Sequence, residues 1–474
     1  MKFTSDIVIG LEIHVELDTN TKLFCGCKRK RVDDEKPNTR VCPACLGHPG
    51  SKPRLNKKAI EHSLKLALAT KSQIASQLVF SRKSYFYPDL AKNFQITQYE
   101  LPIASEGVIQ LASGKEINLT RIHMEEDPAS LVHPKGMGNS NYVLVDYNRS
   151  GDPLCEIVTE PEIESPAEAR EFMKQLLTLL KYLKIFDIND CIIKADANVS
   201  IKESGYKRTE IKNITGFKEI ERAITHEVQR QKEAVKEGRK LTQETRGWDA
   251  SLGITHLMRK KETEDDYGYI IEPDLVTTNI TDDWLKKIKD SLPELPSQKS
   301  SRYIKEFALD PVDATVIAST YELAQIYEEI IHEVDPALAA KWLRRELIRV
   351  MHYNKIEFDE LKITPQHLKA LLRLVQDKKI TENVAQKILE KLSEEVFDVH
   401  DYVKKEGLEA ISDSGEIEKF CKEAIDEAPK AVEDYNKGNE KSLNFIVGLV
   451  MKKSRGKASP NEVKEIIKNI LDNS

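Results

Sequence analysis

The sequence lacks the features that mark membrane and secreted proteins. No apolar run approaches the roughly 20 residues that a membrane-spanning helix needs. The first ten residues, MKFTSDIVIG, show neither the apolar core of a signal peptide nor the Arg- and Ser-rich composition of a transit segment. Charged residues make up 32% and hydrophobic residues 40% of the chain, as is usual in globular domains. We therefore expect a cytoplasmic protein with no membrane contact.

The familiar nucleotide-binding loops are also missing. The chain contains no Walker A loop, no G-x-G-x-x-G motif and no protein-kinase signature. A nucleotide site in this protein would therefore be of a less familiar type. The formal net charge of -6 argues against general coating of nucleic acid, but a local basic patch can dock phosphate while the remaining surface stays acidic.

Cysteine is scarce, with seven residues in 474, which argues against a disulfide framework. Four of the seven form two close pairs, Cys25 with Cys27 and Cys42 with Cys45. Two such pairs joined by a loop can place four thiolates around a tetrahedral Zn²⁺, and four thiolates leave no open position on the metal. We predict a structural zinc site that fastens the loop after the first strand. The remaining cysteines are expected in the core: Cys155, Cys191 and Cys421.

The chain is too long for one hydrophobic core, so several domains are expected. Alternating strand-like runs end before a Pro- and Ser-rich segment at 292–301, and only helical periodicity follows. The helical patterns occur at 165–183, 218–240, 321–331, 337–351, 367–376, 382–392 and 439–454. We predict an α+β domain built on a largely antiparallel sheet over 1–291, an all-α helical domain over 292–404 and a small all-α tail domain over 405–474.

The segment DIVIGLEIHVEL, residues 6–17, alternates over its whole length. Its odd-numbered positions are Ile, Leu or Val, and its even-numbered positions include Glu12, His14 and Glu16. This period of two predicts a β-strand with one buried face. For a single strand, a solvated polar face is the simplest explanation of the charged residues.

Three further segments have the same two-faced pattern. In each, apolar residues alternate with polar ones that can hold a cation or an anion. The polar faces carry Arg121, His123 and Glu125 in the first, Asp196, Asn198 and Ser200 in the second, and Glu210 and Lys212 in the third. Four strands of this kind in one domain predict an open sheet with one face packed and the other lining a polar basin.

Clustered carboxylates in such a basin repel one another unless a cation lies among them. Oxygen ligands favour Mg²⁺ or Mn²⁺, and Mg²⁺ usually bridges to substrate phosphates. Nearby Lys and Arg side chains can hold phosphate oxygens. The combination points to phosphoryl transfer, while a metal-dependent hydrolase fits the same residues.

Long motifs in this sequence resemble the B subunit of the tRNA-dependent amidotransferases, which correct Glu-tRNA(Gln) or Asp-tRNA(Asn). The resemblance extends over essentially the whole chain. The motifs are VIGLEIHVEL, SRKSYFYPDLAKNFQITQYELPI, RIHMEEDPASLVH, VDYNRSGDPLCEIVTEP, ADANVSI, TEIKNITGF, QETRGWD, EDDYGYIIEPDL and EDYNKGNEKSLNFIVGLVMKKSRGKASP. The resemblance implies that the α+β domain is a catalytic cradle domain and that the tail domain binds tRNA.

The resemblance also implies a reaction and partners. A protein of this family binds misacylated tRNA and uses ATP with Mg²⁺, or alternatively Mn²⁺, to phosphorylate the side-chain carboxyl of the attached Glu or Asp. Ammonia then displaces phosphate to give the amide. The ammonia comes from an amidase A subunit, and the heterotrimer is braced by a small C subunit. The present sequence has no Gly/Ser-rich amidase signature, which agrees with an external nitrogen source.

Individual roles follow from the matched motifs. The residues expected to be catalytic are Glu12, His14, Glu125, Glu210 and Lys212, the first four as metal ligands and Lys212 as a phosphate contact. Strand alternation favours Glu125 over Glu126, because Glu125 shares a face with His123. The residues expected to contact the nucleotide are Arg121, Asp196, Asn198 and Asn213. Those expected to approach tRNA are Lys452, Lys453, Arg455 and Lys457.

Two other functions fit the residues themselves. One is a tRNA-binding scaffold whose acidic basin is structural, and the other is a metal-dependent phosphohydrolase unrelated to tRNA. The sequence does not distinguish Glu-tRNA(Gln) from Asp-tRNA(Asn) as substrate. It also departs from the family pattern at Gly268, where the family often has Arg in a Tyr-Arg-Tyr run.

Overall fold

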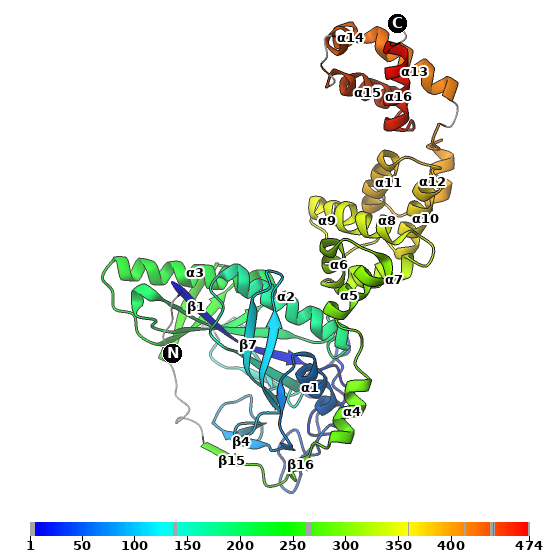
Figure 1. The fold of residues 1–474 in the computed structure, drawn as a ribbon. Coiled ribbons are helices and arrows are strands. Elements are labelled where there is room, and N and C mark those ends of the chain that lie inside the picture. Colours follow the sequence, from blue (N-terminus) through cyan, green and yellow to red (C-terminus); the bar gives the residue numbers. More distant parts are fainter. Residues whose placement is uncertain are drawn as a thin grey trace. The chain divides into compact units, whose positions relative to one another are not determined.

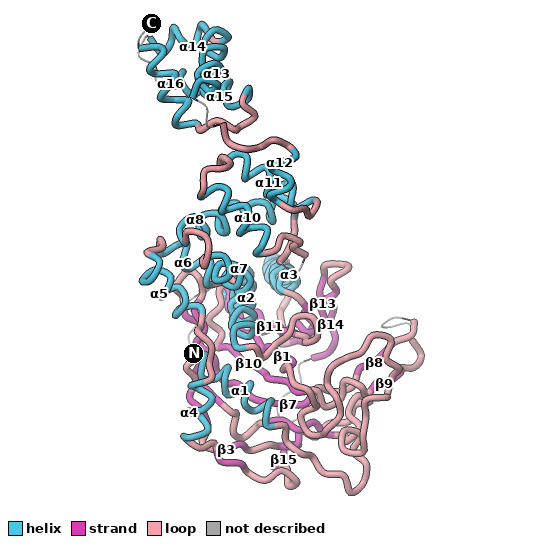
Figure 2. The backbone as a smooth tube through the Cα atoms, turned by 90° about the vertical axis from the view of Figure 1, so that its right-hand side faces the viewer, coloured by secondary structure: helices cyan, strands magenta, loops and turns pink. Residues whose placement is uncertain are grey.

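The computed structural model describes residues 5–135, 140–260, 268–358, 360–411, 414–436, 439 and 441–472. The chain forms two compact units, Met1–Leu295 and Pro296–Ser474. Within the described residues, strands occur only in the first unit, and the second unit is helical (Figure 1, Figure 2). These observations confirm the predicted fold class, in which a largely antiparallel α+β part precedes all-α parts.

A nine-stranded sheet forms the centre of the first unit. Its neighbouring strands pair antiparallel, except that β12 and β13 are parallel. In order across the sheet the strands are β14 (Ile254–Lys260), β13 (Glu244–Asp249), β12 (Thr209–Thr215), β11 (Ile193–Ile201), β1 (Ile7–Glu16), β10 (Pro153–Thr159), β7 (Glu116–Glu126), β6 (Ala104–Gln110) and β2 (Gln73–Ile74). Because β1 lies between β11 and β10, its polar face has neighbours on both sides.

The burial of β1 follows the predicted alternation. Ile9 and Ile13 are fully buried, whereas Glu12 and His14 on the other face are partly exposed. The buried residues join a core that three helices complete. These helices are α1 (Lys57–Ala69), α2 (Pro166–Leu183) and α3 (Phe217–Lys236) (Figure 1). Since the helices cover the apolar face of the sheet, the opposite face is left for polar side chains.

Smaller strand groups lie outside the large sheet. They are the three-stranded sheet of β15 (Gly268–Ile271), β4 (Ser81–Ser84) and β5 (Phe94–Thr97), the hairpin of β8 (Ser130–Val132) and β9 (Leu144–Asp146), and the pair β16 (Thr278–Asn279) and β3 (Gln77–Leu78). Lys83 and Gln95 of the small sheet face a basin over the large sheet, whereas Arg82 and Phe94 face a second cavity. The short helices η1 (Lys202–Ser204) and α4 (Asp282–Asp290) complete the unit.

The second unit contains two hydrophobic clusters. One extends from Tyr303 to Val403 and the other from Ile417 to Ile467. The α-helices of this unit are α5 (Pro296–Phe307), α6 (Pro311–Ala318), α7 (Tyr321–Ile330), α8 (Pro336–Lys341), α9 (Ile348–Asn354), α10 (Pro365–Gln376), α11 (Glu382–Glu394), α12 (Val399–Lys405), α13 (Ser414–Glu427), α14 (Pro429–Asn436), α15 (Ser442–Lys453) and α16 (Pro460–Asp472). The helical pattern at 337–351 spans α8, a π-helical stretch (Trp342–Leu347) and the start of α9, so that stretch departs from α-helical geometry.

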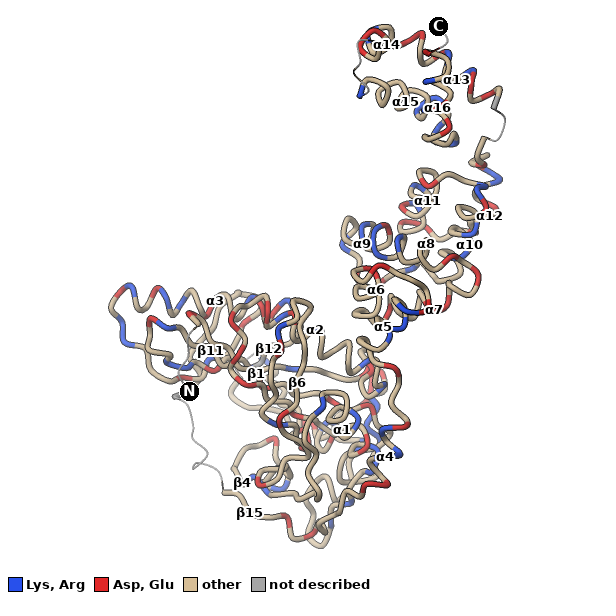
Figure 3. Tube along the Cα trace, viewed as in Figure 1, with Lys and Arg blue, Asp and Glu red and all other residues tan. Residues whose placement is uncertain are grey.

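None of the described helices is long and apolar enough to cross a membrane. Helix α3 is the longest of them, and Lys and Arg are interspersed with Glu along it (Figure 3). Its buried residues, among them Ile220 and Ile224, form the narrow stripe that faces the core. Most of the other charged residues of the helix are at least partly exposed, as its sequence predicts, whereas Glu227 is buried and paired with Arg230.

Candidate functional site

The polar face of the large sheet and the small sheet together line a basin of about 470 Å³. Side chains from β1, β7, β10, β11 and β12 form its floor, and those from β4, β5 and β15 form a wall. Carboxylates outnumber Lys and Arg in the lining: Glu12, Glu16, Glu125, Asp127, Glu156, Asp196 and Glu210 against Lys83, Arg121, Arg149, Lys194 and Lys212. An acidic basin of this kind attracts cations.

The strand register brings a His–Glu cluster to the centre of the floor. His14 on β1 lies opposite Glu156 on β10, which in turn lies opposite His123 on β7. His14 Nε2 is 3.4 Å from Glu156 Oε2 and 3.3 Å from Glu125 Oε1. His123 Nε2 is 3.1 Å from the same Glu156 oxygen. The ligand atoms of His14, Glu125 and Glu156 all lie within 4.8 Å of one another.

Burial and charge act against each other in this cluster. Glu125 and Glu156 are nearly buried, and burial opposes ionisation. For Glu156, burial raises the pKa, but the imidazoles of His123 and His14 outweigh it and hold the pKa well below its usual value. For His14, burial lowers the pKa, but Glu125 and Glu156 outweigh it and hold the pKa well above its usual value. The cluster therefore keeps the Glu156 carboxylate ionised, and a divalent cation can take the place of the proton on His14.

A second polar group lies on β11 and β12, across β1 from this cluster. Lys212 Nζ is 2.8 Å from Asp196 Oδ2 and 3.1 Å from Glu210 Oε1. Burial lowers the pKa of Lys212, but both carboxylates raise it above the usual value, so the ammonium stays charged. Glu210 also accepts a hydrogen bond of 2.9 Å from Thr245 Oγ1. A fixed cation here lies in reach of an anionic group entering the basin.

The structure distributes the predicted residues between these two groups. His14 and Glu125 join the three-ligand cluster, whereas Glu12 accepts a hydrogen bond of 3.0 Å from Asn198 Nδ2 and lines the basin outside that cluster. Arg121 NH2 lies 4.0 Å from Glu156 Oε1. The side chain of Asn213 is outside the described residues.

Sequence reasoning missed Glu156, although the signal was present. Cys155 and Ile157 are fully buried on either side of Glu156, so the strand has the same two-faced alternation as β1. What the sequence does not show is that β10 lies between β1 and β7. That position places the Glu156 carboxylate between two imidazoles.

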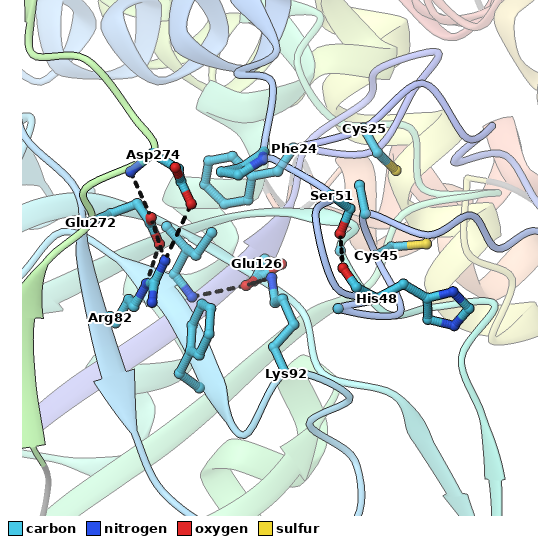
Figure 4. Close-up of a pocket in the computed structure, with 16 residues that line it drawn as sticks. Phe24, Cys25, Cys45, His48, Ser51, Arg82, Lys92, Glu126, Glu272 and Asp274 are labelled. Carbon is cyan, nitrogen blue, oxygen red and sulfur yellow. Dashed lines mark hydrogen bonds and ion pairs between the residues drawn. The ribbon is translucent and has the colours of Figure 1, made fainter.

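Glu125 and Glu126 point to opposite sides of β7. Glu125 faces the basin, whereas Glu126 accepts a hydrogen bond of 2.8 Å from the Ile96 amide and pairs with Lys92. Glu126 lines the second cavity, of about 200 Å³. Figure 4 shows this cavity beside Cys25 and Cys45, which belong to the segment 25–45, here called the cysteine loop. There Arg82 makes a two-pronged ion pair with Glu272, at 2.7 and 2.9 Å. The charges of this cavity are thus paired with one another.

The four paired cysteines lie together. Their sulfur atoms are within 4.8 Å of one another, and Cys42 Sγ and Cys45 Sγ are 3.8 Å apart. Four Zn–S bonds of about 2.3 Å in a tetrahedron require S···S distances of about 3.8 Å. A hydrogen bond from Cys25 lowers the pKa of Cys45 to about 5, which favours a thiolate. The donor set therefore fits a structural Zn²⁺, and Cys155, Cys191 and Cys421 are buried, as predicted.

The cysteine loop is bonded to the chain that leads into the basin. Asn38 donates from its backbone amide to Asp146 Oδ1 and from its side chain to the Val145 carbonyl, and it accepts from the Tyr147 amide. Asn148 Oδ1 accepts from two backbone amides of the loop, at 2.7 Å each. This chain continues to Arg149, which lines the basin and pairs with Asp127 at 3.1 Å. The loop therefore supports one edge of the basin.

The basic segment formed by the last turn of α15 and the residues after it is folded against its neighbours. Lys453 pairs with Glu427 at 2.7 Å and Glu423 at 3.4 Å on α13. The Gly456 carbonyl accepts from Thr381 Oγ1, and the Lys457 carbonyl from the Ile411 amide. The side chains of Lys452 and Arg455 are exposed. These last two are the best placed for an external phosphate.

Comparison with known proteins gives two family matches. Residues 7–286 match the model described as GatB/GatE catalytic domain, and residues 325–471 match the model described as GatB domain. Curated relatives carry the name of the B subunit of aspartyl/glutamyl-tRNA(Asn/Gln) amidotransferase. One from Carboxydothermus hydrogenoformans is 42% identical, covering 98% of each chain. One from Clostridium botulinum is 40% identical, covering 98% of each. One from Caldanaerobacter subterraneus is 40% identical, covering 98% of this chain and 99% of the relative.

Proposed function

This chain belongs to the GatB/GatE family of tRNA-dependent amidotransferase subunits, and from this premise we propose that its basin phosphorylates and then amidates the side-chain carboxyl of Glu-tRNA(Gln), Asp-tRNA(Asn) or both. The observation that carries the proposal is the convergence of His14, Glu125 and Glu156 with a partly buried, charged Lys212 in one basin. A site for phosphoryl transfer needs this combination of cation ligands and fixed positive charge.

The reaction has two balanced steps. A side-chain carboxylate oxygen attacks the γ-phosphorus of ATP, the bond to the β,γ-bridging oxygen breaks, and ADP leaves. Ammonia nitrogen then attacks the carbon of the resulting acyl phosphate, the carbon–oxygen bond breaks, and inorganic phosphate leaves. The nitrogen loses its extra proton and the product is the side-chain amide. Positioning and charge neutralisation by the protein account for most of the catalysis in the first step.

The described residues have distinct parts in this scheme. His14, Glu125 and Glu156 would hold a divalent metal, with Glu12 and Glu210 as further carboxylates of the basin. A Mg²⁺ bound there would neutralise developing phosphate charge, and the imidazole ligand makes Mn²⁺ an alternative. Lys212 holds phosphate oxygens, and Arg121, Asp196 and Asn198 position the nucleotide. The cysteine site holds Zn²⁺ and keeps the edge of the basin in place.

The partners follow from the family. Ammonia comes from an amidase A subunit, and the assembly is a heterotrimer braced by a small C subunit. The reaction takes place in the cytoplasm. The domain roles are a cradle over 1–291, a helical domain over 292–404 and a tRNA-binding tail over 405–474. In the tail, Lys452 and Arg455 would contact the tRNA backbone.

One experiment tests the proposal as a whole. The chain is co-expressed with A and C subunits, and the purified complex receives γ-labelled ATP, glutamine and each misacylated tRNA in turn. We expect ADP release that depends on the aminoacyl-tRNA, together with formation of the amidated tRNA. ADP release without aminoacyl-tRNA would instead indicate a phosphohydrolase, and tRNA binding without ATP turnover would indicate a scaffold.

A further inference from the structure

Three consecutive aromatic residues lie at the edge of the basin, and two of them are exposed. Tyr85 lines the basin, whereas Phe86 is 90% and Tyr87 54% exposed. A phenylalanine so exposed gains almost nothing from packing within the described chain, because the stabilisation of an aromatic ring scales with the area it buries. We call Tyr85, Phe86 and Tyr87 the aromatic rim.

The backbone at the C-terminal end of the aromatic rim is held in place. The Pro88 carbonyl accepts a hydrogen bond of 3.1 Å from Tyr147 Oη, and the Asp89 carbonyl accepts one of 3.0 Å from the Ala129 amide. The Leu90 amide closes a turn on the Tyr87 carbonyl at 3.1 Å. These bonds tie the segment to both ends of the β8–β9 hairpin. The exposed rings therefore adjoin a backbone segment that is fixed, which lowers the entropic cost of using them for binding.

The surroundings of the rim combine apolar surface with positive charge. Val132 and Leu144, paired across the β8–β9 hairpin, are about half exposed, at 48% and 54%. Lys83 lines the basin and lies over the Tyr85 ring, with Nζ 5.8 Å from the ring centre. Arg149 lines the basin next to the hairpin base. Aromatic faces flanked by cations form the usual platform for unpaired nucleotides, whose bases stack while their phosphates meet Lys or Arg.

We infer that the aromatic rim is a stacking platform for the unpaired 3′-terminal nucleotides of the aminoacyl-tRNA. The inference rests on the proposed function. The reacting carboxyl is attached through the amino acid to the terminal ribose, so the last nucleotides must cross the edge of the basin when that carboxyl enters it. The rim is continuous with the basin through Tyr85 and through Pro128, which also lines it. Phe86 and Tyr87 each stack on one base, and Lys83 and Arg149 face the phosphates.

The test uses the assembled amidotransferase and compares ring with non-ring side chains. Phe86→Leu and Tyr87→Leu keep apolar bulk but remove the stacking face, whereas Phe86→Trp keeps it. Stacking of one base on one ring corresponds to about a fivefold to hundredfold change in affinity. We expect each Leu variant to raise the KM for misacylated tRNA by that factor, with kcat and the KM for ATP unchanged, and Phe86→Trp to resemble the parent. Val276→Ala, at an 88% exposed position outside the basin lining, serves as the control.

A spectroscopic arm reports stacking directly. tRNAs carrying 2-aminopurine at successive positions of the unpaired 3′ end should lose fluorescence on binding the parent complex and Phe86→Trp. One labelled position should keep its fluorescence with Phe86→Leu, and a different one should keep it with Tyr87→Leu. Equal KM values for the Leu, Trp and parent proteins would overturn the platform while leaving the proposed function intact. A raised KM for ATP would overturn it by assigning the rings to the adenine base. Loss of partner subunits from the purified variants would overturn it by showing that the rim contacts protein.

Discussion

His14 Nε2 lies 3.4 Å from Glu156 Oε2. The two residues belong to the antiparallel strands β1 and β10, which are neighbours in space but far apart in the chain. Glu125 completes the cluster from β7, on the other side of β10. Each of the three groups is held by a strand of the same rigid sheet, so the distances among them do not depend on loops. This rigidity suits a site that must keep cation ligands in fixed geometry.

We expect Glu156→Gln to weaken metal binding and catalysis together. The amide keeps the size of the side chain but removes the charge that a divalent cation would balance. Loss of one ligand should raise the Kd for Mn²⁺, measured by electron paramagnetic resonance, and should lower tRNA-stimulated ATP turnover by about a hundredfold or more. The matched control is Glu116→Gln, an exposed glutamate at the other end of β7. Normal Mn²⁺ affinity in Glu156→Gln would remove Glu156 from the ligand set.

Glu12→Ala separates catalysis from tRNA binding. Glu12 lies on the basin floor beside Asn198, whereas the basic tail residues belong to the other compact unit. We expect ATP turnover stimulated by Glu-tRNA to be abolished and the Kd for tRNA to stay close to that of the parent, measured by filter binding. Surviving turnover would show that Glu12 is dispensable for the metal and nucleotide site.

The cysteine site predicts a metal content and a local change on metal loss. Purified protein should contain about one zinc per chain by atomic emission, and Cys45→Ser should contain far less, because three thiolates hold Zn²⁺ more weakly. Without the metal, amide hydrogen exchange should accelerate at 36–40 and at 145–148, which are hydrogen-bonded to each other. Cys421→Ala, in a different core, should keep its zinc. A zinc ratio near zero in the parent protein would contradict the site.

The basic tail segment should contribute to tRNA affinity through charge. Replacing Lys452, Lys453, Arg455 and Lys457 by Ala should weaken tRNA binding and reduce the slope of log K against log salt by up to about 0.9 for each phosphate that the variant no longer neutralises. Since Lys453 is paired with Glu423 and Glu427, most of the change should come from Lys452 and Arg455. Lys464→Ala, at an exposed position on α16, is the control. An unchanged slope would make this segment an ordinary solvated turn.

A buried histidine on α1 predicts a pH dependence of stability. Burial lowers the pKa of His62 to about 4, and its Nε2 donates to the Asp18 carbonyl at 2.9 Å while Nδ1 has no partner among the described residues. Because the folded pKa lies below the unfolded value of about 6.5, the unfolded chain takes up the proton first. The contribution of neutral His62 to the free energy of unfolding is therefore fully present above about pH 6.5. It is lost as the pH falls towards 4 and amounts to at most about 3 kcal/mol.

His62→Gln tests this directly, since the amide can keep the hydrogen bond to Asp18 and does not titrate. In urea titrations at pH 7, 6 and 5, the unfolding free energy of the parent protein should fall more steeply with acid than that of the variant. Parallel pH dependences of the two proteins would show that His62 titrates normally.

Local sequence pattern was enough for much of the fold. The alternation of residues 6–17 predicted β1 and its buried face, and apolar spacing predicted α2 and α3 to within a few residues. The alternation of side chains along β7 also selected Glu125 as the residue that faces the basin, because successive side chains of a strand point to opposite sides. The pattern at 337–351 predicted helix but not its π-helical stretch, since one extra residue in a turn barely alters the apolar spacing.

The composition of the site depended on strand order, which no local pattern contains. Alternation by itself determined that Glu12, His14 and Glu125 lie on polar strand faces, and the spacing of four cysteines indicated a metal site. Only the tertiary structure decided that β10 lies between β1 and β7, that His14 and His123 share Glu156, and that Asn38 ties the cysteine loop to the basin edge. Side-chain periodicity is a property of neighbouring residues, whereas the pairing of strands far apart in the chain is settled by packing of the whole core.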